Sequence, residues 1–145
     1  TLGRADLTLA YANIVAGVQP EWFVMENVER ITKSHILKEA IAILRKAGYG
    51  ISTTVLDASY CGVPQSRKRF FMIGYLHSPD GFLDAVLEKK QSKKPLTVFE
   101  YMGDKLDIEF YYRHPRSYAR RGIFSVHEPS ATIRGVNRPL PKGYS

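Results

Sequence analysis

The sequence predicts an α/β fold in which helices flank a mostly parallel sheet that carries an antiparallel hairpin at one edge. Apolar residues recur at helical spacing and then as short continuous runs, and this alternation repeats along the first half of the chain. Short continuous apolar runs are typical of strands buried on both faces of a parallel sheet. The last two runs lie too close together for a helical crossover, so we expect them to pair as antiparallel neighbours.

Helix ends support the order of the elements. Gly17 and Pro20 end the first helix, Ser34 occupies the N-cap position of the second, and Gly48 follows that helix where a C-terminal cap belongs. The expected elements are, in order, a helix over 6–17, a strand over 22–25, a helix over 36–44, a strand over 51–56, a loop over 57–68, a strand over 70–75, a helix over 82–87, an exposed connection over 88–94 and a helical turn over 98–102.

Composition bounds the class of protein. The chain has 145 residues, 44% apolar and 24% charged, which suffices for one domain with a core. No apolar run approaches the length of a membrane span, and the N-terminus does not have the pattern of a signal peptide, so we expect a soluble, cytoplasmic protein. The single cysteine, Cys61, cannot form an internal disulfide, and the four histidines show no metal-ligand spacing, so we expect no metal.

The net charge of +7 lies mostly at the C-terminal end. Residues 111–145 hold seven Lys and Arg against one acid, Glu128, whereas the first 110 residues carry a net charge of only +1. A near-neutral body joined to a basic segment favours binding to a polyanion, although a solvated basic surface would give the same composition. We place a boundary near residue 92, with residues 1–92 as one region and the irregular basic residues 93–145 as another.

Two polar clusters flank the predicted strands. Glu26, Asn27 and Val28 follow the first apolar run, at the strand end where open α/β sheets place their ligands, although such residues also occur at ordinary strand ends. Arg67 and Arg69 precede the last strand in a loop and alternate, so both guanidinium groups should reach the same face. Neighbouring guanidinium groups favour an anion or a carbonyl oxygen between them, with a structural salt bridge as the alternative.

Together these clusters resemble conserved motifs of the DNA (cytosine-5) methyltransferase family. Residues 20–28 resemble its Glu-Asn-Val motif, residues 62–74 its Gln-x-Arg-x-Arg motif, and residues 4–7 the short motif whose leucine lines the cofactor pocket. Residues 128–134 are similar to the part of its target-recognition region that carries a Thr-Ile pair. The resemblance identifies residues 1–92 as the C-terminal part of the catalytic domain and residues 93–145 as the beginning of the target-recognition region.

The resemblance implies a partial Rossmann-like fold and a flipped cytosine as the substrate. S-adenosyl-L-methionine is implied as the cofactor, with Leu7 as a contact. Glu26 would bind cytosine N3 and the exocyclic amine from a buried strand end, and Arg69 would donate to O2. Arg67 would hold Glu26 or a phosphate, whereas Asn27 and Gln65 would tie the loops around the pocket.

Double-stranded DNA is the partner that the resemblance implies, with Arg and Tyr of the basic segment making phosphate and base contacts. It also implies a bacterial restriction-modification system, and hence association with the nucleoid when bound to DNA. The implied DNA-binding residues are Arg113, Arg116, Arg120, Arg121, Thr132 and Arg134.

The chain departs from the family in several motifs. The Pro-Cys motif with the nucleophile, the Phe-x-Gly-x-Gly loop and the closing C-terminal motifs are absent, and Cys61 occupies a variable position. We therefore expect part of an enzyme, inactive alone, whose missing motifs belong to the same gene product or to a partner chain. The alternatives are a non-catalytic nucleic-acid-binding module and a relative of RNA cytosine methyltransferases. An unrelated acid/base enzyme is disfavoured because Asp57 and Asp80 match no recognisable pairing.

Overall fold

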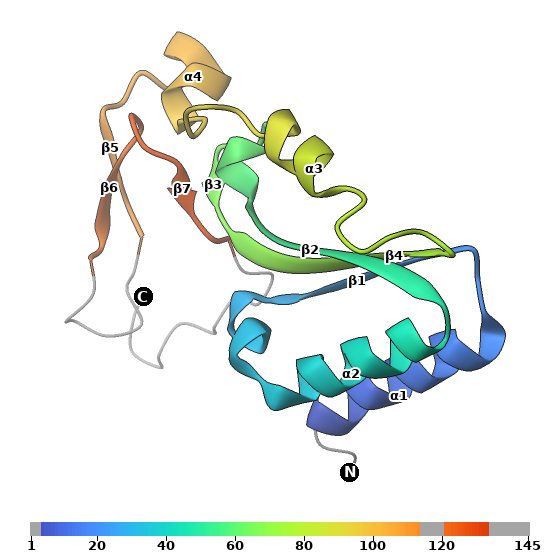
Figure 1. The fold of residues 1–145 in the computed structure, drawn as a ribbon. Coiled ribbons are helices and arrows are strands. Elements are labelled where there is room, and N and C mark those ends of the chain that lie inside the picture. The colour runs from blue at the N-terminus through green and yellow to red at the C-terminus, as the bar shows by residue number, and fades with distance from the viewer. Residues whose placement is uncertain (1–3, 114–120, 134–145) are drawn as a thin grey trace, which may run out of the picture.

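The structure, a computed structural model, describes residues 4–113 and 121–133. These residues form an α/β fold (Figure 1). The elements are α1 (Arg4–Val18), β1 (Trp22–Val28), the 3₁₀ turn η1 (Glu29–Lys33), α2 (His35–Lys46), β2 (Tyr49–Asp57), η2 (Ala58–Tyr60), β3 (Gln65–Ser66), β4 (Lys68–Leu76), α3 (Asp84–Lys90), α4 (Val98–Met102), η3 (Gly103–Leu106), β5 (Phe110–Tyr112), β6 (Ile123–Ser125) and β7 (Ser130–Ala131).

The main sheet has three strands in the order β1-β4-β2, and β4 runs antiparallel to both neighbours. The antiparallel pairing of β2 with β4 is confirmed. The expectation of mostly parallel pairing is wrong for the described strands. The helical connection through α2 makes β1 and β2 run the same way, but β4 lies between them and separates the two parallel strands. The start of β4 therefore lies at the same end of the sheet as the C-terminal ends of β1 and β2.

Helices α1 and α2 lie side by side under one face of this sheet (Figure 1). Helix α2 begins at the predicted N-cap, because the Ser34 hydroxyl accepts a hydrogen bond from the Ile36 N–H, and Gly48 follows it at φ 96°. The core between helices and sheet is formed by buried apolar side chains: Ala12, Val15, Phe23, Met25, Leu37, Ala40, Leu44, Tyr49, Ile51, Phe70 and Met72. This layer fixes the position of the strand ends.

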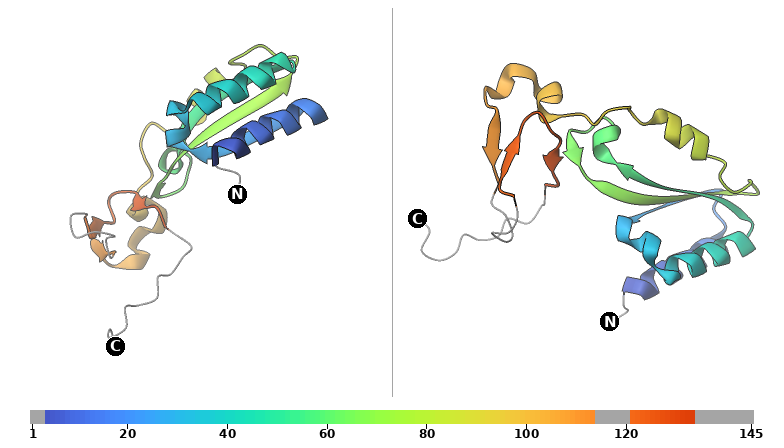
Figure 2. Two further views of the ribbon diagram at one scale, coloured as in Figure 1. Left: turned by 90° about the horizontal axis from the view of Figure 1, so that it is seen from below. Right: turned by 60° about the vertical axis from the view of Figure 1, so that its left-hand side comes forward.

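The opposite face of the sheet is only partly covered. Residues 77–83 and α3 lie over β2, where the buried Ser52 hydroxyl accepts a hydrogen bond from the Leu83 N–H (Figure 2). Over β1, by contrast, Trp22 and Val24 are 49% and 59% exposed while Phe23 and Met25 are buried. The prediction that this strand is buried on both faces is therefore wrong for the described residues.

The second region contains more secondary structure than predicted. The helical turn over 98–102 is confirmed as α4, which has a capping box between Thr97 and Glu100. Strands β5 and β6 form an antiparallel hairpin, and β7 pairs in parallel with β3 of the first region. The expectation of an irregular segment is wrong here because strands of two or three residues have no detectable periodicity, and their pairing partners lie far away in sequence.

Most predicted boundaries differ from the observed ones by a few residues. The strands predicted over 22–25, 51–56 and 70–75 extend to 22–28, 49–57 and 68–76, and the helix predicted over 82–87 is shifted to 84–90. The predicted connection over 88–94 therefore begins inside α3. Within the described part of the chain, no helix is both long and apolar enough to cross a membrane.

Candidate active site

The two polar clusters meet at one end of the main sheet. Glu26 lies near the C-terminal end of β1 and is opposite Phe71 of β4, while Val28 is opposite Arg69. Directly opposed residues of an antiparallel pair share a face, so Glu26 and Arg69 are diagonal neighbours on the face away from α1 and α2. The pleat of the sheet thus brings together residues that are 43 positions apart in the sequence.

Arg69 is the cation that contacts Glu26. Its Nε lies 2.7 Å from the Glu26 Oε1, and its Nη1 donates a 2.8 Å hydrogen bond to the Lys68 carbonyl. Arg67 was predicted to hold Glu26 or a phosphate; Arg69 takes the first of these roles in the structure, and the second stays a prediction. Arg67 lies in the turn before β4, and its guanidinium makes no hydrogen bond or ion pair with any residue in 4–113 or 121–133.

The Glu26 carboxylate remains accessible. The side chains of Glu26 and Arg69 are 49% and 24% exposed, so the expected burial of this carboxyl is wrong for the described residues. An ion pair that is exposed to this degree contributes only about 0–1 kcal/mol to stability. The pair therefore orients the carboxylate more than it stabilises the fold, and it presents an acceptor and a donor side by side to an incoming polar ring.

Asp57 holds the loop that leads to Arg67 and Arg69, a role that we did not predict for it from the sequence. Its Oδ1 accepts hydrogen bonds from the Ser59 N–H (3.1 Å), the Ser59 hydroxyl (2.9 Å) and the Arg67 N–H (3.1 Å). Burial alone would raise the pKa of this carboxyl, but the bonds from Ser59 and Arg67 and the nearby Lys68 charge together lower it. The Asp-x-Ser pattern before a turn is a sequence signal from which this role could have been predicted.

The second region closes the other side of the same loop. Gln65 and Ser66 in β3 pair with Ser130 and Ala131 in β7, and the Thr132 hydroxyl donates a 2.8 Å hydrogen bond to the Ser66 carbonyl. The Ser66–Arg67 segment therefore has partners from β2 and from the second region.

The predicted DNA-binding residues have different environments. The Arg113 Nη2 donates to the Thr132 carbonyl at 2.5 Å, whereas Arg121 forms an ion pair with Glu128 and lies over the Phe124 ring, 4.6 Å from its centroid. Both arginines thus have intramolecular partners. The other three predicted arginines lie outside the described residues: Arg116, Arg120 and Arg134.

The remaining predicted site residues are not gathered around Glu26. Leu7 lies on α1 and is 57% exposed. Asn27 alternates with Glu26 along β1 and so points to the opposite face, where its Oδ1 accepts from the Val28 N–H at 2.8 Å. Gln65 joins β3 to β7 through its backbone. Their proposed roles stay predictions.

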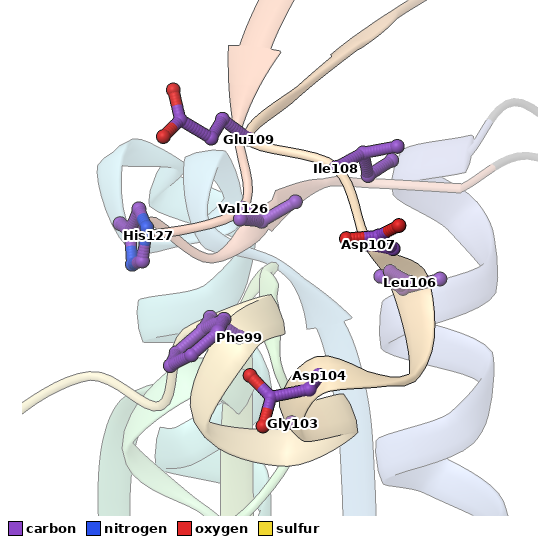
Figure 3. Close-up of a pocket in the computed structure, with 9 residues that line it drawn as sticks. All are labelled: Phe99, Gly103, Asp104, Leu106, Asp107, Ile108, Glu109, Val126 and His127. Atoms are coloured by element: carbon purple, nitrogen blue, oxygen red, sulfur yellow. The ribbon is translucent and has the colours of Figure 1, made fainter.

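A separate hollow lies in the second region, with a volume of about 340 Å³ (Figure 3). It contains no predicted site residue, so it is distinct from the Glu26–Arg69 pair. Within residues 4–113 and 121–133, no three His, Cys, Asp or Glu side chains are grouped as metal ligands, and Cys61 is an exposed free thiol. The hollow is lined by Phe99, Gly103, Asp104, Leu106, Asp107, Ile108, Glu109, Val126 and His127.

Comparison with known proteins connects this geometry to one family. The C-5 cytosine-specific DNA methylase family matches residues 1–136. The chain is 62% identical over 145 residues to the Type II methyltransferase M.HindV of Haemophilus influenzae, covering 100% of this chain and 48% of that protein. It is 55% identical over 143 residues to M.HgiDI of Herpetosiphon aurantiacus, covering 99% and 46%. The chain thus spans about half the length of these curated relatives.

A solved structure supports the fold. The Dnmt2 methyltransferase of S. pombe superimposes with a TM-score of 0.54 at 20% identity, covering 80% of this chain and 36% of that one. At this identity the similarity concerns the fold alone, and it confirms that the α/β arrangement is that of part of a methyltransferase fold.

Proposed function

The chain belongs to the C-5 cytosine-specific DNA methylase family, and from this membership we propose that it forms the cytosine pocket of a DNA (cytosine-5) methyltransferase of a restriction-modification system. The observation that carries the proposal is the Glu26–Arg69 pair, 2.7 Å apart at one end of the sheet. Two motifs that are separate in the sequence meet there with a carboxylate and a guanidinium accessible to a ligand.

In this proposal the pair reads and polarises a cytosine that has been rotated out of the duplex. The Glu26 carboxyl forms hydrogen bonds with N3 and the exocyclic amine of the cytosine. Proton sharing at N3 draws electron density away from C6, where a thiolate from outside this chain attacks. Arg69 keeps the carboxylate oriented through Nε and stabilises charge on the ring near O2. Arg67, whose side chain has no partner within the described residues, contacts the DNA backbone.

S-adenosyl-L-methionine is the proposed methyl donor, and it would supply an electrophilic methyl group to C5. Leu7 is the one residue of this chain that we propose as a contact, and a single leucine, 57% exposed on α1, does not make a binding site for a charged nucleoside. The described residues by themselves therefore do not fit the cofactor. Most of its site must come from the segments that this chain does not contain.

We propose that those segments dock on α1 and β1. Helix α1 has apolar residues around its whole circumference, and Leu7, Ile14 and Val18 are 57%, 65% and 72% exposed. Strand β1 pairs only with β4 among the described residues, which leaves its other edge without a neighbouring strand. The Val24 side chain is exposed there, and the Val24 carbonyl accepts a 3.1 Å hydrogen bond from the Tyr11 hydroxyl. A two-sided apolar helix next to an open strand edge is typical of an incomplete sheet layer.

The second region would contact double-stranded DNA, as the start of the target-recognition region. We propose residues 1–92 and 93–145 as the two parts, and a site of action in the bacterial cytoplasm, at the nucleoid. The proposed DNA contacts come from the basic segment, but three of the residues that the resemblance implied for them, Arg113, Arg121 and Thr132, already have intramolecular partners. DNA binding by Arg121 would therefore compete with its ion pair to Glu128.

A covalent trapping assay tests the pocket. The complete gene product that contains this chain, with any partner chain, is incubated with S-adenosylmethionine and duplex DNA carrying 5-fluorocytosine, and the adduct is measured by gel. Fluorine at C5 cannot leave as a proton does, so the covalent complex persists. We expect Glu26→Gln to lower the trapping rate at least about 100-fold and Arg69→Ala about 100- to 1000-fold.

Arg45→Ala is the matched control. It removes an exposed ion pair of similar geometry, 2.9 Å between the Arg45 Nε and the Asp80 Oδ2, far from Glu26, and should leave trapping within about twofold. Binding of DNA without any adduct would overturn the enzyme proposal in favour of a non-catalytic module. Preferential binding and trapping of tRNA in competition would favour an RNA substrate instead.

A further inference from the structure

We propose that Thr132 is a positioning residue, which holds the peptide unit between Ser66 and Arg67 in the orientation that the pocket needs. The inference rests on the proposed function, because it concerns how the second region acts on the loop that leads to Arg67 and Arg69, which we call the pocket loop. It assigns to Thr132 a role other than the direct DNA contact that the resemblance implied.

Both polar groups of the peptide bond between Ser66 and Arg67 are held by side chains. The Ser66 carbonyl accepts from the Thr132 hydroxyl at 2.8 Å, and the Arg67 N–H of the same peptide unit donates to the Asp57 Oδ1 at 3.1 Å. We call these two bonds the peptide clamp. One comes from the end of β2 and the other from the second region, so the plane of this peptide is fixed from both sides.

The orientation of that peptide controls the pocket through a short path. Strand β4 begins at Lys68, directly after Arg67, and Arg69 is the residue that contacts Glu26. A rotation of the 66–67 peptide therefore turns the Arg67 side chain and displaces the entrance of β4. Displacements of about 1 Å in a catalytic group can lower rates by about 100-fold.

The chemistry of the hydroxyl argues against a phosphate partner in this arrangement. Threonine has one O–H donor, and phosphate oxygens only accept, so the proton donated to the Ser66 carbonyl is not available to a phosphate. Arg113 supports the same arrangement, because its Nη2 donates to the Thr132 carbonyl and its N–H donates to the Gly122 carbonyl at 2.7 Å. Arg113 thereby ties Thr132 to the β5–β6 hairpin.

Paired substitutions at Thr132 give the main test, in the complete gene product. Thr132→Val keeps the shape and removes the hydroxyl, whereas Thr132→Ser keeps the hydroxyl. At saturating DNA we expect Thr132→Val to lower the single-turnover trapping rate about 10- to 100-fold with an unchanged Kd for DNA, and Thr132→Ser to stay within about threefold of the parent. Amide exchange at Arg67 should accelerate in the valine variant and not in the serine variant.

Arg113 gives a second test that separates positioning from DNA contact. Loss of one phosphate contact lowers the slope of log affinity against log salt by about 0.9. We expect Arg113→Ala to lower the trapping rate while this slope stays unchanged, with Arg45→Ala as the control for general effects of removing an exposed arginine.

Several outcomes would overturn the inference. These are weaker DNA binding by Thr132→Val with an unchanged rate at saturation, a serine variant as slow as the valine variant, or a lower salt slope in Arg113→Ala. If Thr132→Val fails to fold, the salt slope and the trapping rate of Arg113→Ala decide whether the inference holds. Absence of any adduct with the parent protein is a different result, because it contradicts the proposed function itself.

Discussion

The two regions of this chain are stabilised in different ways. The three strands of the main sheet, which lie in residues 4–92, have seven to nine residues each and pack on a continuous apolar core. The strands within residues 93–133 have two or three residues, and Val126 is the one buried apolar residue among those described there. The second region depends instead on backbone and side-chain bonds to the first, such as Leu96 N–H to the Ser59 carbonyl at 2.7 Å. A region held in this way can change its sequence without disturbing the fold of the other.

The largest expected effect comes from truncating the first core. Leu44 is 0% exposed between α2 and the sheet, so Leu44→Ala should lower the free energy of unfolding by about 2–5 kcal/mol. Val126→Ala removes fewer atoms, at the one buried apolar residue of the second region, and should affect mainly that region. Urea unfolding monitored by amide exchange in each region measures how much stability each of the two regions loses in the two variants. An equal loss of protection in both regions after either change would show that they unfold as one unit.

The next effect concerns Asp57, which ties the end of β2 to the loop that leads to Arg67 and Arg69. Asp57→Asn should cost about 1 kcal/mol at pH 7, because charge-assisted bonds to Ser59 and Arg67 become neutral ones. The folded pKa lies below the ordinary value of 3.8, so this stability is present above that pH and is lost as the pH falls through the folded value.

The pH dependence gives the measurement for Asp57. Urea midpoints of the parent and Asp57→Asn should differ at pH 7 and approach each other as the pH falls below the ordinary value of 3.8. A difference in urea midpoint that does not shrink as the pH falls would contradict the role of the ionised Asp57 carboxylate.

The smallest effect compares helix caps in the two regions. Thr97→Ala removes the capping box of α4, and Ser34→Ala removes the N-cap bond of α2, each at a cost of about 1 kcal/mol. Because α4 has five residues and none of them is buried, we expect its amides to exchange freely in the Thr97 variant with little change in global stability. The Ser34 variant should instead lower the global unfolding free energy. A lower global unfolding free energy in the Thr97 variant, with none in the Ser34 variant, would mean that α4 belongs to the main cooperative unit.

Local sequence determined the elements of the first region. The spacing of apolar residues in α2, the Ser34 cap and the antiparallel pairing of β2 with β4 were all predictable, because each depends on residues close together in the chain. Motif residues also identified Glu26 and Arg69, whose types suit the chemistry of a cytosine pocket.

Tertiary structure decided which residues meet. Insertion of β4 between β1 and β2 placed Arg69, not Arg67, beside Glu26, and a two-residue pairing of β3 with β7 placed Thr132 against Ser66. Neither outcome has a local signal, because strand order and long-range pairing depend on how the layers pack. The sequence alone therefore determined the residues available for chemistry, and packing of distant segments decided their partners.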